Sequence, residues 1–233
     1  MKIKYYGHAA FKIVTNDGLQ ILIDPFISGN PQCQVPIEEI STDIILVTHG
    51  HQDHLGDTLE IAHKTGAQTI ATAEIATFVE KQGFEAVSMN KGGTVVIGDV
   101  SITMTDAKHS SSIETAEGPE YAGEPGGFII KLEDGKKIFH AGDTSLFGDM
   151  KTIIGDLYKP DISLLPIGDK FTMGPEEASI AAGWLQSRII IPMHYNTFPG
   201  IEQDPEFLAK ITEEENIGTK VVILNSEGEY IEE

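Results

Sequence analysis

The stretch that most limits what this chain can fold into is "VTHGHQDH", residues 47–54. It places His49, His51, Asp53 and His54 directly after the β-rich apolar run "DIILV", and the helix-like "LGDTLEIAHKTG" follows it. We therefore expect the motif on the loop between a strand and a helix. Imidazole and carboxylate groups bind zinc, manganese and iron, so four of them within six residues favour a metal site over a polar surface cluster.

The spacing of the motif predicts two metal positions. His49 and His51 are two residues apart on extended backbone and can reach the same ion. Asp53 and His54, at the start of the helix, point to a neighbouring position. Four ligands do not fill two sites, so further ligands are required at other strand ends. Three apolar runs end on such residues: His109 after "VSITMTDA", Asp143 after "KIFHAG" and His194 after "RIIIPM".

The remaining sequence alternates short apolar runs with helical patterns, which is typical of an α/β fold. The chain begins as a β-meander over residues 2–25, with "NDG" as a hairpin turn. No linker rich in Ser, Gly or Pro divides it, so we expect one domain over residues 1–233, with two halves that each mix strands and helices. Further strands are expected over 67–72, 94–98, 100–107, within 126–143, 161–168 and 188–194, and helices over 55–66, 73–83, 146–158 and 174–187.

The stretch "SSSIETAEGPEYAGEPGG", residues 110–127, is the longest segment without periodicity and joins the two halves. A loop of this length is usually a lid, a binding loop or a disordered insert. If it overhangs a site, its glutamates make the entrance acidic and favour small substrates that are neutral or singly charged. These glutamates are Glu114, Glu117, Glu120 and Glu124.

The charge balance disfavours nucleic acid and membranes as partners. The chain has 16 Lys and Arg against 36 Asp and Glu, a formal charge of -20, and should repel anionic backbones and lipids. Arg188 is the single arginine, so the chain has little capacity for the paired hydrogen bonds by which arginine usually binds phosphate. The one cysteine, Cys33, and the lack of an apolar leader indicate a soluble cytoplasmic protein. A homo-oligomer is possible, because the sequence contains no coiled-coil heptad or symmetric patch that would decide the oligomeric state.

In chain order, H-x-H-x-D-H, a later histidine, the aspartate of "GDT" and a final histidine resemble the metallo-β-lactamase superfamily along nearly the whole chain. The resemblance implies a four-layer αββα sandwich with a dinuclear site at one edge of the two central sheets. Zinc is the first expectation for the two divalent ions, with manganese or iron as alternatives. The implied ligands are His49, His51 and His109 for the first metal, Asp53, His54 and His194 for the second, and Asp143 as the bridge.

Shorter stretches narrow the resemblance. "YYGHAAF", "IDPF", "HAGDT", "PIGDKFTMGP" and "MHYNTFP" are similar to a family of short, uncharacterised bacterial and archaeal metal-dependent hydrolases. That family is related to ascorbate-6-phosphate lactonase and, more distantly, to the phospholipase D that releases N-acylethanolamines. The implied partner is a small-molecule substrate.

The predicted function is a dinuclear hydrolase in which a metal-bridging hydroxide cleaves a small ester, lactone or phosphoester. A phosphodiesterase or nuclease-like member is an alternative, but 233 residues at a charge of -20 leave no room for a basic exosite or an inserted domain. A non-catalytic metal-binding interaction protein is a further alternative. It is disfavoured because a residue able to bind metal fills every ligand position.

Asp53, Asp143 and His8 are the candidate catalytic residues. The leaving group needs a proton donor, for which Asp53, His8, His140, Tyr195 and water are the candidates. His8, in the "GH" turn between two early strands, either lies beside the metals or caps the turn.

Two further positions have both a functional and a structural interpretation. Asp24 ends the strand "ILID" and either orients a metal-bound histidine or simply forms a turn. Lys170 and Thr172 precede an expected helix start at Pro175, and they are candidates for the wall of a pocket.

Overall fold

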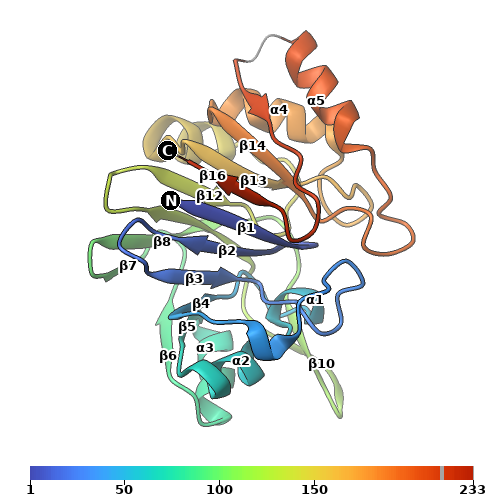
Figure 1. Cartoon of the computed structure of the whole chain (residues 1–233). Coiled ribbons are helices and arrows are strands. Elements are labelled where there is room, and N and C mark those ends of the chain that lie inside the picture. The colour runs from blue at the N-terminus through green and yellow to red at the C-terminus, as the bar shows by residue number, and fades with distance from the viewer. Residues whose placement is uncertain (216–217, 233) are drawn as a thin grey trace. The chain divides into compact units, whose positions relative to one another are not determined.

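Two seven-stranded β-sheets organise the chain in the computed structural model, which describes residues 1–215 and 218–232 (Figure 1). Each sheet belongs to one of two structural units, and both units combine strands with helices, so the predicted α/β class is confirmed. The first unit comprises Met1–Asn90, Ser110–Pro125 and Leu224–Glu233, and the second comprises Lys91–His109 and Gly126–Ile223.

The sheet of the first unit contains β1 (Lys2–Gly7), β2 (Ala10–Val14), β3 (Gln20–Ile23), β4 (Ile44–Leu46), β5 (Gln68–Thr72), β6 (Ala86–Met89) and β16 (Glu229–Ile231). Their order is β16-β1-β2-β3-β4-β5-β6. The antiparallel meander β1-β2-β3 is confirmed, and β3 to β6 run parallel. The predicted "NDG" turn is present: the Thr15 N–H donates to the carbonyl of Leu19 (3.0 Å), and Gly18 adopts φ +90°.

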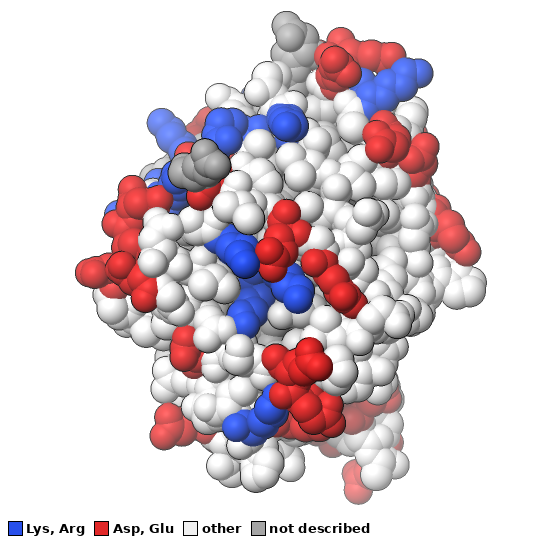
Figure 2. Space-filling model, viewed as in Figure 1, with Lys and Arg blue, Asp and Glu red and all other residues white. Residues whose placement is uncertain are grey.

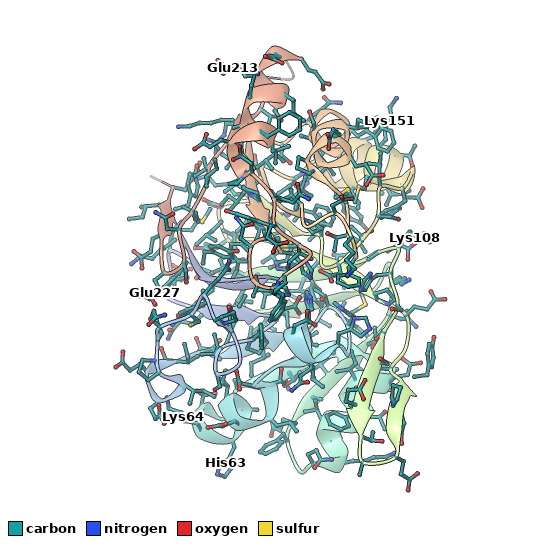
Figure 3. The ribbon with its side chains drawn as sticks, turned by 90° about the vertical axis from the view of Figure 1, so that its right-hand side faces the viewer. His63, Lys64, Lys108, Lys151, Glu213 and Glu227 are labelled. Atoms are coloured by element: carbon teal, nitrogen blue, oxygen red, sulfur yellow. The ribbon has the colours of Figure 1, made fainter. Side chains whose placement is uncertain are left out.

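Short helices complete the first unit: η1 (Ile37–Glu39), α1 (Gln52–Leu55), α2 (Thr58–Thr65) and α3 (Ala73–Lys81). A single helix over 55–66 is wrong, because the chain breaks at Gly56. That residue adopts φ +45°, and a Cβ there would lie 2.4 Å from the carbonyl oxygen of Pro25. α3 packs on β5 and β6, and α2 packs on β5. His63 on α2 is exposed and points away from the ribbon (Figure 3).

The sheet of the second unit contains β7 (Thr94–Ile97), β8 (Val100–Asp106), β11 (Gly126–Lys131), β12 (Lys137–His140), β13 (Ile162–Pro166), β14 (Ile189–Met193) and β15 (Lys220–Val221). Their order is β15-β14-β13-β12-β11-β8-β7, with β12 to β15 parallel. The π-helix η2 (Met150–Tyr158), α4 (Pro175–Leu185) and α5 (Pro205–Glu214) accompany it, and α4 contacts both others. Pro175 is the first residue of α4, as predicted.

Three of the parallel strands, β4, β13 and β14, are buried along their whole length, which explains their continuous apolar sequences. A parallel strand covered on both faces needs apolar side chains on both. Each run ends where the chain leaves the sheet at its carboxyl edge, the usual position of functional groups in such sheets. The metal-binding motif follows β4, Asp143 follows β12 and His194 follows β14.

Residues 110–127 are not the irregular loop that the sequence predicts. They form an antiparallel hairpin of β9 (Ser112–Thr115) and β10 (Gly118–Tyr121), in which Glu114 pairs with Pro119. The hairpin belongs to the first unit. Its sequence contains Gly, Pro and several glutamates and lacks clear alternation, so the pairing of the backbones was not visible in the residue pattern. Its acidic side chains are exposed: Glu114, Glu117, Glu120 and Glu124.

Candidate metal centre

The structure brings the four motif residues of the first unit together at the end of β4. Nε2 of His49 lies 3.0 Å from Nδ1 of His51, so the loop curls and brings the two rings together, the condition for both to reach one ion. The His49 ring centroid is 4.6 Å from that of His51 and 4.1 Å from that of His54. Asp53 and His54 lie on the short helix α1, and His51 is its N-cap residue.

Asp24 binds the backbone and side chains behind this loop. Its Oδ1 accepts a hydrogen bond from the Thr48 N–H (2.8 Å), and its Oδ2 accepts from the Thr48 hydroxyl (2.7 Å) and from Nδ1 of His54 (2.8 Å). The Thr48 hydroxyl has only one proton, so its oxygen accepts from Nδ1 of His49 (3.0 Å). Both histidines therefore carry their proton on Nδ1 and present the Nε2 lone pair as a metal ligand.

His8 lies beside Asp53 in the first unit. Its Nε2 is 3.1 Å from Oδ2 of Asp53, and its side chain is fully buried. The backbone is held in a left-handed conformation (φ +57°), with the His8 N–H bonded to the Gln32 side chain (2.9 Å) and its carbonyl accepting from the Tyr5 hydroxyl (3.0 Å). Such strained backbone is typical of functional sites, because the surrounding bonds must compensate for it.

The hairpin supports the loop through contacts that the sequence did not predict. The Gly50 N–H donates to the Ser111 hydroxyl (3.0 Å), and the Ser110 hydroxyl lies 3.5 Å from Nε2 of His51. A Cβ at Gly50 would lie 2.6 Å from the Cβ of Ala122, so only glycine fits. No sequence signal links these positions, because they are about sixty residues apart. Thr48 was also missed, although its place before His49 could have drawn attention to it.

The second unit brings together the other three predicted ligands. Oδ2 of Asp143 lies 3.0 Å from Nε2 of His194 and 3.5 Å from Nε2 of His109. All three side chains are buried or nearly so. The Thr144 hydroxyl, next to Asp143, accepts from the Lys108 N–H (3.0 Å), which joins the segments that carry Asp143 and His109.

His194 occupies a strained position against the neighbouring loop. Its φ is +57°, a left-handed value that non-glycine residues seldom adopt. The loop after β13 approaches it so closely that a Cβ on Gly168 would lie 2.3 Å from the His194 carbonyl oxygen. Glycine at 168 is therefore required for this approach.

The remaining candidates from the sequence occupy distinct places in the second unit. His140 is fully buried, and its Nδ1 accepts from the Gly142 N–H (3.1 Å). Burial, with a smaller contribution from the charge of Glu206, raises the pKa of Tyr195 to about 12, so its hydroxyl stays protonated at neutral pH. Lys170 is exposed, with its ammonium 5.0 Å from the Phe171 ring centroid, and Thr172 is buried.

The donor atoms of both clusters fit metal ions. Two ligands that are each about 2.0–2.1 Å from a tetrahedral ion lie about 3.3 Å apart. The His49–His51 distance of 3.0 Å and the Asp143 distances of 3.0 and 3.5 Å lie close to this value. Imidazole nitrogen and carboxylate oxygen are also the donor types that zinc, manganese and iron prefer.

Comparison with known proteins places the chain in a family. The family described as "Beta-lactamase superfamily domain" matches residues 2–194. A UPF0173 metal-dependent hydrolase of Methanosphaera stadtmanae is 64% identical over 234 residues, covering 100% of both chains. Another, from Methanobrevibacter smithii, is 58% identical and covers 100% of this chain and 97% of that protein. The chain therefore belongs to the β-lactamase superfamily and, within it, to the UPF0173 metal-dependent hydrolases.

Solved structures agree with this assignment. Igni18, a metallo hydrolase from the hyperthermophilic archaeon Ignicoccus hospitalis, is similar with a TM-score of 0.89 and 36% identity, covering 100% of this chain and 99% of that chain. The metallo-β-lactamase fold protein YhfI from Bacillus subtilis has a TM-score of 0.73 at 14% identity, covering 98% of each chain, which supports the fold alone. The predicted metallo-β-lactamase fold is thus confirmed, and the protein is a metal-dependent hydrolase. No helix among the described residues is long and apolar enough to cross a bilayer.

Proposed function

We propose that the protein is a dinuclear hydrolase that cleaves a small ester, lactone or phosphoester. The observation that carries the proposal is the carboxylate of Asp143, one oxygen of which faces two histidine nitrogens at 3.0 and 3.5 Å. A carboxylate in this position suits a bridge between two cations. In the proposed ligand set, His49, His51 and His109 bind the first ion, Asp53, His54 and His194 bind the second, and Asp143 binds both.

This ligand set requires residues from both structural units. We therefore propose that residues 1–233 act as one catalytic domain, which the relatives that match the whole chain support. Zinc is the first candidate for both ions, with manganese or iron as alternatives. We also propose a cytoplasmic location, for which the single cysteine is the support. Separation of the host cell into cytoplasmic and membrane fractions, followed by detection of the protein in each fraction, tests the location.

The chain's own residues supply the proton chemistry of the proposed reaction. When bound, two divalent ions lower the pKa of a shared water and polarise the substrate oxygen. Asp53 and His8 are close enough, at 3.1 Å, to hold one proton between Oδ2 and Nε2. We propose that this pair delivers a proton to the leaving group, and that Asp53 and Asp143 would also hold the ions that polarise the substrate.

The direct test combines metal analysis with a substrate panel. Elemental analysis of freshly purified protein should find about two divalent ions per chain. A panel of carboxylic esters, lactones, phosphodiesters and thioesters is then assayed with that metal. Asp143→Ala should bind fewer ions and lose turnover, whereas Asp156→Ala, an exposed aspartate on η2, is the matched control and should behave like wild type.

Three results would contradict the proposal. One ion or none in wild-type protein would refute the dinuclear site. Turnover in Asp143→Ala equal to wild type would refute the role of that carboxylate. A panel in which only phosphodiesters or nucleic acids are cleaved would favour the nuclease-like alternative, and no turnover at all would favour the non-catalytic metal-binding protein.

The role of His8 can be separated from metal binding. His8→Gln should keep both ions, because His8 is not a proposed ligand, but should lower kcat by roughly a hundredfold or more through loss of proton transfer. His63→Gln, on the exposed side of α2, is the matched control (Figure 3). Metal content and kcat are measured on the same preparations. Unchanged kcat in His8→Gln would show that the residue only forms the turn.

A further inference from the structure

A cavity of about 360 Å³ lies in the first unit beside the metal-binding loop. The loop contributes Gly50 to its wall, and the hairpin contributes Ile113 and Glu114. Gln52 and Leu55, three residues apart on α1, face the cavity, whereas the proposed ligands on the same helix do not line it. The cavity therefore lies on the face of α1 turned away from the metal ligands. Nothing in the proposed reaction uses it.

The inner part of the cavity is apolar. Leu55 and Ile113 belong to the buried hydrophobic core of this unit, and Leu59 and Phe78 pack against that core while remaining partly exposed. A volume of this size is in the range of small-molecule sites, which are mostly apolar with a few polar groups that fix the orientation of the ligand. An aromatic or short alkyl body fits such a surface by dispersion and burial.

The outer part of the cavity is acidic. Glu60 on α2 and Glu114 on β9 line it, and both are exposed. Neither carboxylate forms an ion pair with any of the described residues. Asp57 also lines the cavity, but its carboxylate already accepts from the Ile27 and Ser28 N–H groups (2.8 Å each). No lysine or arginine is among the described residues of the wall.

We propose that this cavity binds a small organic cation, in which an aromatic or alkyl body is joined to one ammonium group. The body packs against Leu59 and Phe78, and the ammonium pairs with Glu60 and Glu114. The net charge of -20 raises the local concentration of such cations around the protein. The occupant contacts the backbone of Gly50 without displacing a metal ligand, so its binding does not depend on turnover or on the proposed reaction.

Ligand-detected NMR titration of the full-length protein at low salt provides the test. The probes are 2-phenylethylamine, the neutral 2-phenylethanol and the anionic 3-phenylpropionate, which share a similar body and differ in charge. The amine should bind roughly three- to tenfold more tightly than the alcohol, because two partly solvated charge pairs are involved. The carboxylate should bind most weakly. Equal binding of all three probes, or no binding at millimolar concentration, would overturn the proposal.

Two variants locate the binding site. The double variant Glu60→Gln, Glu114→Gln should weaken amine binding to the level of the alcohol. The control Glu117→Gln, Glu120→Gln also removes two negative charges, but at positions that do not line the cavity, and should leave amine binding unchanged. Leu59→Trp narrows the apolar part of the cavity and should weaken binding of the amine and the alcohol alike. Equal weakening in both double variants would mean that only the overall charge attracts the amine, and an unchanged affinity in Leu59→Trp would place the ligand elsewhere.

Discussion

One buried carboxylate, that of Asp24, controls two histidines of the metal-binding loop. It reaches His54 directly and His49 through Thr48, so the proton position on each ring depends on the same group. Its own φ of +46° shows that the backbone is strained to place it there. A turn alone, the competing interpretation of "IDP", would not require a fully buried charge with three hydrogen bonds.

Asp24→Asn should weaken metal binding by roughly tenfold to a hundredfold, the usual effect of losing a partner that orients metal-binding histidines. The amide keeps the shape of the side chain but no longer favours the proton on Nδ1. Competition with a chelator of known affinity measures the change, and circular dichroism confirms that the variant is folded. Asp17→Asn, in the exposed turn between β2 and β3, is the control. Identical chelator midpoints for Asp24→Asn and wild type would contradict the role of Asp24.

A second carboxylate, that of Asp106, makes stability depend on acid pH. Burial raises the pKa of Asp106, but hydrogen bonds from Lys108 and Lys91 together outweigh it, and the pKa lies below its ordinary value. Because the folded-state pKa is lowered, the stabilisation is present above the unfolded pKa of about 3.9 and is lost as the pH falls through the folded value. Lys108 lies at the surface (Figure 3), so solvent screens the pair.

The free energy of unfolding of wild type should therefore fall more steeply than that of Asp106→Asn as the pH is lowered from about 5 to about 2. The difference should stay below about 1 kcal/mol, because the partners are partly exposed. Urea unfolding at several pH values measures both slopes. Parallel slopes would show that the ion pairs contribute nothing to folding.

Among the elements, the hairpin β9-β10 and the loop after β4 must be considered together. The loop has its ligands fixed on one side by Asp24, and the hairpin contacts it at Gly50. The contact is tight: a Cβ on Gly50 would lie 2.6 Å from Ala122 and 3.0 Å from Ile113. The glycine between two histidines is thus explained by packing against the hairpin.

Gly50→Ala should destabilise the protein by about 1–3 kcal/mol through overpacking. The loop must shift to admit the methyl group, so metal affinity should fall as well. Gly148→Ala is the control, because a Cβ there meets no atom within 4 Å. Urea unfolding and chelator competition measure the two effects. A free energy of unfolding equal to that of Gly148→Ala would mean that the hairpin shifts to admit the methyl group at no cost in stability.

The sequence predicted the elements whose apolar patterns are strong and missed those that depend on backbone pairing. "DIILV" and "RIIIPM" are continuous apolar runs, and both are buried parallel strands. "AVSM" forms β6 and "GPEY" forms β10, yet neither alternates, because each is only partly buried or exposed. The predicted ligands gather within each unit, since strand ends are visible in the pattern. The contacts of Ser111 and Thr48 were not visible in the sequence pattern, because they depend on the folded geometry.

For the whole molecule, the dominant property is negative charge. Figure 2 shows Asp and Glu side chains in several separate groups across one face, with Lys and Arg side chains between them. The field of such a surface repels anions over about a Debye length, roughly 10 Å at 0.1 M salt. The four exposed glutamates of residues 114–124 add to it beside the metal-binding loop of the first unit.

Changing these four residues to glutamine should raise kcat/KM for an anionic substrate at low salt and leave a neutral analogue unchanged. The effect should disappear at high salt, because screening removes the repulsion. Glutamates on α5, Glu213 and Glu214, provide a control for the general loss of charge. An unchanged kcat/KM at low salt would remove the argument that the hairpin selects against anions.

The pairing of β16 with β1 has a consequence for synthesis. Lys2 pairs with Ile231, so an edge of the first sheet depends on residues that the ribosome makes more than two hundred positions later. Segments of the two units also alternate along the chain. The second unit needs residues up to Ile223 and the first needs Leu224–Glu233, so neither unit is complete until nearly all of the chain has been made. The nascent chain must therefore hold its half-built sheets, with unpaired edges, until nearly all of it has emerged, and a chaperone that shields strand edges should raise its yield.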